Sequence, residues 1–120
     1  MKELRKIQKA VKQYENLLLE NQENARMYHE QYLKEIEVLG EIINLYIEQT
    51  SKVFQEWCNI SIQIFVLPEN NIFQKIKRKI NMNIVNYYLN KYSYELTEIG
   101  IMQRGLERIK QRFIQYKYLT

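Results

Sequence analysis

The sequence predicts an all-α protein built around a long antiparallel helical hairpin of the coiled-coil type, and three observations support this. Glycine (3) and proline (1) are too scarce to punctuate the many turns of a sandwich or barrel. The clearest stop signal falls near the middle of the chain, at residues 67–71. Apolar or aromatic residues recur every seven positions in the first half, which is typical of a helix that packs along another helix. These residues are Leu4, Val11, Leu18, Ala25, Tyr32, Leu39, Tyr46 and Val53.

The 120 residues and the apolar fraction of 46% predict a single folded domain covering residues 1–120. The heptad repeat predicts a first helix over about residues 2–67. Pro68 disfavours the α conformation at Leu67, while Asn70 and Asn71 suit a turn and a helix cap. We therefore expect a turn at 68–71 and a second helix over about residues 72–118. One face of this helix, with Phe73, Ile76, Ile80, Ile84 and Tyr88, is expected to pack on the first helix.

Two alternative architectures fit the same sequence. The first helix can break near Asn24 or Thr50 and fold back into a compact bundle of three or four helices. Alternatively, residues 60–66 and 80–84 alternate with a strand-like period, which suits a coiled coil with a small β-hairpin at its tip. Helical spacing also fits both segments, and we favour it.

The predicted hairpin leaves one end of the first helix uncovered. If facing positions meet around a turn centred between residues 68 and 69, Gly40 faces about residue 97 and residue 120 lies opposite residue 17. Residues 1–16 then extend past the second helix by roughly 24 Å. Because uncovered apolar surface marks an interface, we expect a partner protein or a second copy to complete the hairpin. The predicted interface residues are Leu4, Ile7, Val11 and Tyr14, followed by Trp57 and Phe65 at the tip.

The sequence contains no constellation of residues typical of an enzyme. It has one histidine, His29, one cysteine, Cys58, and no aspartate or glycine-rich phosphate loop. Glu-x-x-His pairs and four-ligand zinc sets are also missing. We therefore expect no catalytic residues, metal ligands or cofactor. The main hypothesis is a non-enzymatic structural or adaptor subunit, a scaffold component that binds other proteins of a larger assembly, or a second copy, through helical apolar faces.

Charge distribution supports a second hypothesis. Residues 1–60 hold 8 Lys/Arg and 10 Glu, whereas residues 61–120 hold 10 Lys/Arg and 4 Glu. The basic second helix suits contacts with the phosphates of RNA or DNA. The candidate contacts are Lys75, Lys77, Arg78, Lys79, Arg108 and Arg112. A third hypothesis is a coiled-coil chaperone, which has the same hairpin shape.

Cysteine usage and hydropathy bear on the compartment. A lone cysteine excludes an internal disulfide and suits a reducing environment. The most apolar run, residues 42–67, is interrupted by Glu48, Lys52 and Glu56, which argues against a membrane span. Because charges occur throughout the first fifteen residues, no secretory signal is expected. We therefore expect an intracellular protein of the cytoplasm or of an organelle interior.

Overall fold

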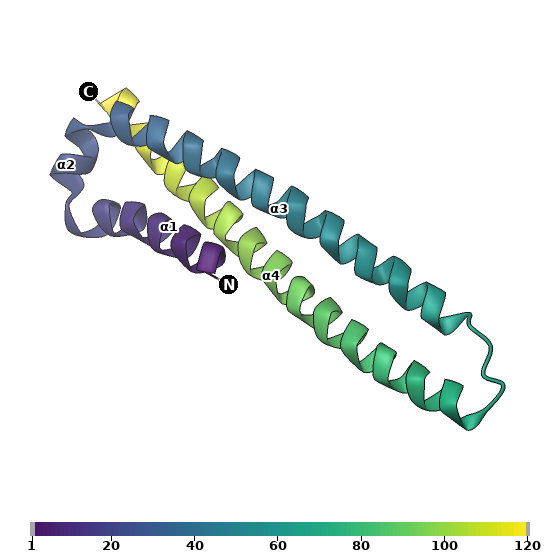
Figure 1. Cartoon of the computed structure of the whole chain (residues 1–120). Coiled ribbons are helices and arrows are strands. Elements are labelled where there is room, and N and C mark those ends of the chain that lie inside the picture. The colour runs from purple at the N-terminus through teal and green to yellow at the C-terminus, as the bar shows by residue number, and fades with distance from the viewer. Residues whose placement is uncertain (1, 120) are drawn as a thin grey trace. The chain divides into compact units, whose positions relative to one another are not determined.

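The computed structural model describes residues 2–119, with side chains as far as Tyr118. Four helices follow one another along the chain, namely α1 (Lys2–Glu20), α2 (Gln22–Met27), α3 (His29–Phe65) and α4 (Ile72–Leu119) (Figure 1). The described residues contain no strand, so the all-α prediction is confirmed. The β-hairpin alternative is wrong, because residues 60–65 belong to α3 and residues 80–84 belong to α4.

The single helix predicted over residues 2–67 is divided into three in the structure. The first break lies at Asn21, whose side-chain oxygen accepts a hydrogen bond from the backbone N–H of Asn24 at 3.4 Å and so caps α2. The second break lies at Tyr28, between α2 and α3. Asparagine favours such local bonds over the helical ladder. The chain therefore bends close to Asn24, as in the compact-bundle alternative.

The turn between α3 and α4 lies where the sequence predicts it. Asn71 caps α4, because its side-chain oxygen accepts a hydrogen bond from the backbone N–H of Gln74 at 2.9 Å. The Gln74 side chain in turn accepts from the backbone N–H of Asn70 at 2.6 Å. This reciprocal pair resembles a capping box, with Gln at the third helical position. The cap explains why α4 begins at Ile72.

The described chain packs as two compact units. The terminal unit contains α1, α2, α3 up to Ile47, and α4 from Glu98 onward. The turn unit, residues 48–97, contains the rest of α3 and α4 and the loop that joins them.

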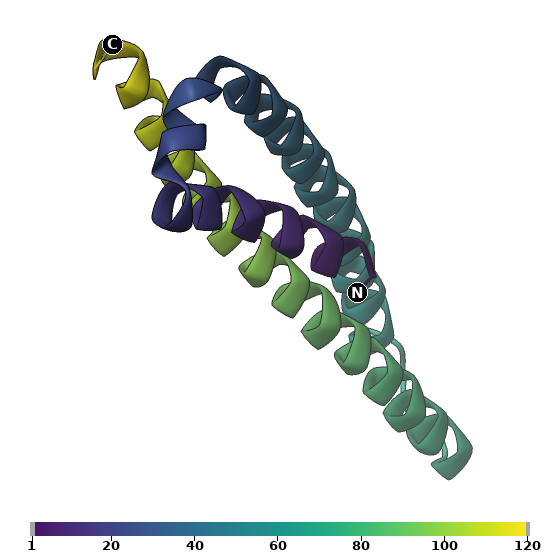
Figure 2. The same ribbon diagram turned by 90° about the vertical axis from the view of Figure 1, so that its left-hand side faces the viewer.

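In the terminal unit, α1 folds back and packs against α3 and α4 (Figure 2). Leu4, Ile7 and Val11 are only 5%, 4% and 8% exposed and share one core with residues of the longer helices. The prediction that residues 1–16 lack an intrachain partner is therefore wrong. The physical reason is the bend at residues 21–28, which returns the apolar stripe to the unit's own core. The other fully buried side chains of this core include Leu18, Ile36, Ile43, Ile99 and Phe113.

The pairing of α3 with α4 is also shifted from the predicted register. Gly40 faces Leu106, not residue 97, which is a displacement of about two and a half helical turns. In the turn unit, the Arg78 guanidinium lies 5.4 Å from the Phe65 ring centroid and donates a hydrogen bond to the Phe65 carbonyl. A turn centred between residues 68 and 69 would place residue 72 opposite Phe65. In the structure Arg78 meets Phe65 instead, so the first turns of α4 come before the point where the two helices begin to pair.

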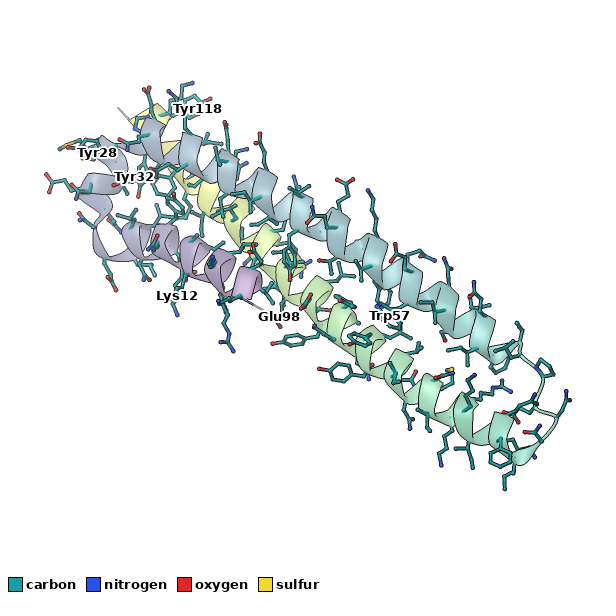
Figure 3. All side chains as sticks on the ribbon, viewed as in Figure 1. Lys12, Tyr28, Tyr32, Trp57, Glu98 and Tyr118 are labelled. Atoms are coloured by element: carbon teal, nitrogen blue, oxygen red, sulfur yellow. The ribbon has the colours of Figure 1, made fainter. Side chains whose placement is uncertain are left out.

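Two helices alone build the turn unit. Val85, with 2% of its surface exposed, is the buried apolar residue at their contact. Beside it, Trp57 of α3 stacks on Tyr88 of α4 with ring centroids 4.5 Å apart and planes at 10° (Figure 3). Thr50 and Glu95 are also buried, and every buried polar side-chain atom among the described residues has a hydrogen-bond partner. Because each helix buries one face only, large apolar side chains remain on the other faces.

Candidate protein-interaction surface

The four amino-terminal residues predicted to form an interface are part of the terminal unit's own packing. Leu4, Ile7 and Val11 lie in the core, and Tyr14 packs against it. The Tyr14 hydroxyl donates a hydrogen bond to a carboxylate oxygen of Glu35 at 3.1 Å. Burial, followed by this hydrogen bond and the Glu35 charge, raises the pKa of the Tyr14 hydroxyl to about 12. The interface prediction assumed that these side chains are exposed, and in the structure they pack within the terminal unit.

The two tip residues behave differently from each other. Trp57 is half-buried against Tyr88, as expected of a side chain that closes the contact between the helices. Phe65 is 71% exposed, with the Arg78 guanidinium over its ring in cation–π geometry. Among the predicted interface residues, Phe65 is the one that stays largely open to solvent.

A larger exposed apolar surface lies on α4 of the turn unit, and the sequence-based prediction assigned much of it to the inner face. At about 100° per residue, six side chains fall within a sector of about 80° on this helix. Their exposed fractions range from 48% to 79%. We call these residues the α4 outer stripe: Phe73, Ile76, Ile80, Ile84, Tyr87 and Tyr94.

Another set of α4 residues faces α3. Val85 is buried, and Met82, Tyr88 and Leu89 around it are half-buried. The same helix therefore has two apolar faces, one used within the unit and one open to solvent. The prediction that Phe73, Ile76, Ile80 and Ile84 pack on the first helix is wrong, because the actual register turns this row outward. A signal for the outer stripe is present in the sequence, since Phe73, Ile80, Tyr87 and Tyr94 are spaced at exact intervals of seven.

Positive charge borders the α4 outer stripe. Between Asn70 and Tyr94 the chain carries five basic residues and no acidic one. Arg78 is already paired with Glu69 at 2.8 Å, on the side of α4 that faces the loop. The ammonium of Lys91 lies 5.4 Å from the ring centroid of Tyr92. Lys75, Lys77 and Lys79 are exposed and form no ion pair within residues 2–119.

The basic residues predicted to contact nucleic acid are divided between the two units. Lys75, Lys77, Arg78 and Lys79 belong to the turn unit, where Lys77 and Arg78 also line a hollow of about 260 Å³ with Leu67 and Pro68. Arg108 and Arg112 belong to the terminal unit. They line a separate hollow of about 330 Å³, together with Glu15, Leu18 and Gly105. Each unit thus has its own small set of cations.

The two residues considered for chemistry, His29 and Cys58, belong to different units. The Nδ1 atom of His29 hydrogen-bonds the carbonyl oxygen of Arg26 at 2.9 Å, within the bend before α3. Cys58 is a half-buried free thiol. Among the residues that the structure describes, no three His, Cys, Asp or Glu side chains are placed to share a metal ion.

None of the helices in the described chain combines the length and the apolar character needed to cross a membrane. An open hollow of about 320 Å³ in the terminal unit is lined by Gly40, Asn44 and Gln103. The side-chain amide of Gln103 donates a hydrogen bond to the side-chain oxygen of Asn44 at 2.7 Å. The chain matches no protein family model, no curated protein and no solved structure.

Proposed function

We propose that this protein is a non-enzymatic structural or adaptor subunit that binds other proteins of a larger assembly through helical apolar faces. The observation that carries the proposal is the α4 outer stripe, whose six large apolar side chains are all at least 48% exposed. Contiguous exposed apolar surface marks interaction sites in folded proteins. Its seven-residue spacing is that of a helix that packs along another helix.

A second exposed row supports the same proposal. Val38, Ile42 and Leu45 lie on α3 of the terminal unit, at steps of four and three, and all are exposed. Their spacing places them on one face of the helix. Each unit thus offers a solvent-facing apolar row, which suits an adaptor that meets more than one partner helix.

Affinity purification from the native source, with and without nuclease, tests the proposal. The α4 outer stripe variant Ile76→Ser/Ile80→Ser is compared with the matched control Asn86→Ser/Gln115→Ser, which changes exposed polar positions of the same helix. We expect a discrete, stoichiometric set of proteins that survives nuclease, is retained by the control and is lost from the stripe variant. An unchanged protein set with the stripe variant would contradict the proposal.

Association with RNA or DNA is the second candidate function. It is supported by the three exposed lysines without ion pairs, Lys75, Lys77 and Lys79. Phosphate contacts release counterions, so affinity falls steeply between about 50 and 200 mM salt. Measured affinity for nucleic acid that does not change over this range would exclude this candidate.

A further inference from the structure

We propose that the α4 outer stripe docks an acidic amphipathic helix of another protein in coiled-coil register. This inference rests on the proposed adaptor function and specifies the chemistry of the partner. Three features of the turn unit support it: the width of the stripe, the polar residues within its register, and the charges along its borders.

The stripe is long and narrow. From Phe73 to Tyr94 it covers roughly 32 Å of helix at 1.5 Å per residue. Over this length its large apolar side chains stay within about 80° of the helix surface. A straight row with a seven-residue repeat fits one partner helix, because the repeat keeps the seam facing that helix as the two supercoil. A lipid surface is matched better by a broad apolar face.

Polar residues occupy part of the same register. If Phe73, Ile80, Tyr87 and Tyr94 take the first core position of successive heptads, the second core position holds Ile76, Asn83 and Asn90. Both asparagines are exposed. A polar side chain at a core position selects a polar partner and fixes the register, at a cost in stability. The partner helix should therefore present polar residues at two successive layers and apolar residues at the others.

The borders of the stripe determine the charge of the partner. Lys77 lies beside the seam on one edge and Lys79 beside it on the other, in the positions that set partner choice in coiled coils. Neither lysine has an ion-pair partner among the described residues. Pairing of this stripe with the same stripe of a second copy would bring no carboxylate to either lysine, because residues 70–94 contain no acidic residue. Such pairing would leave the positive charges uncompensated, which disfavours it. A helix with glutamate at the matching positions would neutralise both edges.

A designed peptide tests the inference on the full chain. The probe is a labelled helix of roughly four heptads with leucine and isoleucine at its core positions, asparagine at the two layers that face Asn83 and Asn90, and glutamate along both borders. Its control has lysine in place of the border glutamates. We expect the acidic peptide to bind about tenfold more tightly than the basic peptide in fluorescence anisotropy, and the difference to shrink with salt.

Two variants make the test specific. Ile80→Asp should weaken binding of the acidic peptide by about tenfold or more, because it places a carboxylate within the apolar seam. Lys77→Glu/Lys79→Glu should reverse the preference, so that the basic peptide binds better. All three positions are exposed, and unchanged circular dichroism and Trp57 fluorescence would show that both variants keep the fold.

Several results would overturn the inference. They are equal binding of the two peptides, no reversal in the double-lysine variant, a self-associated dimer that Ile80→Asp dissociates, and binding to phosphatidylserine vesicles that the acidic peptide cannot displace. If both peptides fail while the Ile76→Ser/Ile80→Ser variant still loses its co-purifying proteins, the charge inference falls and the adaptor function stands. Failure of both experiments removes both.

Discussion

Replacing Ile7 with alanine should destabilise the terminal unit by about 2–3 kcal/mol. Ile7 is 4% exposed and belongs to the same core as residues of α3 and α4. The substitution removes three carbon atoms from this core, which at about 0.8 kcal/mol each amounts to about 2.4 kcal/mol. The cavity adds to that loss, and the higher helix propensity of alanine offsets about 0.4 kcal/mol of it.

Urea denaturation followed by far-UV circular dichroism measures this effect. With a typical slope for a chain of this size, the transition midpoint should fall by about 1–2 M. Lys9→Ala, at an exposed position of the same helix, provides the control and should change the midpoint little. An Ile7→Ala midpoint within error of the control would refute the packing of α1 and restore the uncovered amino-terminal stripe.

The fluorescence of Trp57, the only tryptophan, reports on the turn unit in the same experiment. If Ile7→Ala shifts the circular dichroism transition but leaves the fluorescence transition in place, the two units unfold separately. If the two transitions move together, the units unfold as one cooperative structure.

Three further predictions follow from particular contacts. The folded state holds the Tyr14 proton more tightly than the unfolded state, in which the tyrosine pKa is 10.0, so the free energy of unfolding should fall as pH rises from about 10 to about 12. Denaturation curves measured at a series of pH values should show a smaller fall for Tyr14→Phe. Asn71→Ala removes the cap of α4 and should lower the free energy of unfolding, measured by urea denaturation, by about 0.5–2 kcal/mol. Asn71→Asp keeps a capping oxygen and should retain most of this stability. Gly40→Ala should stabilise the protein by about 0.5–1 kcal/mol, since a Cβ there would lie 4.0 Å from Leu106, an ordinary contact; a lowered melting temperature would show that the helices approach more closely than that.

The helical class and the turn could be predicted because local chemistry determines them. Pro68 and Asn71 act within their own segment, and α4 begins at the predicted residue. The bends at residues 21 and 28 were harder to predict, because the heptad repeat continues through them. Leu18, Ala25 and Tyr32 all contact the terminal unit's core although they lie in different helices. Periodicity identifies which residues face a core but not whether one helix carries them.

The candidate surface was predicted only in part, for a related reason. Phe65 and the lysines after the turn are exposed, and the contacts predicted for them stay predictions. The α4 outer stripe depends on which of two apolar faces of α4 meets α3, and that choice follows from the register of the pair. The register in turn depends on which residue of α4 meets the end of α3, and in the structure Arg78 meets Phe65. Such a tertiary property is not encoded in the spacing of one helix.

The fold-back of α1 has a consequence for biosynthesis. Leu4, Ile7 and Leu18 are synthesised well before Ile99 and Phe113, which complete their core. Until then, these apolar side chains have no native cover on the carboxyl-terminal side. Contacts of such long sequence separation form slowly, and transiently exposed apolar segments are prone to aggregate. The nascent chain should therefore depend on chaperone protection until α4 is complete.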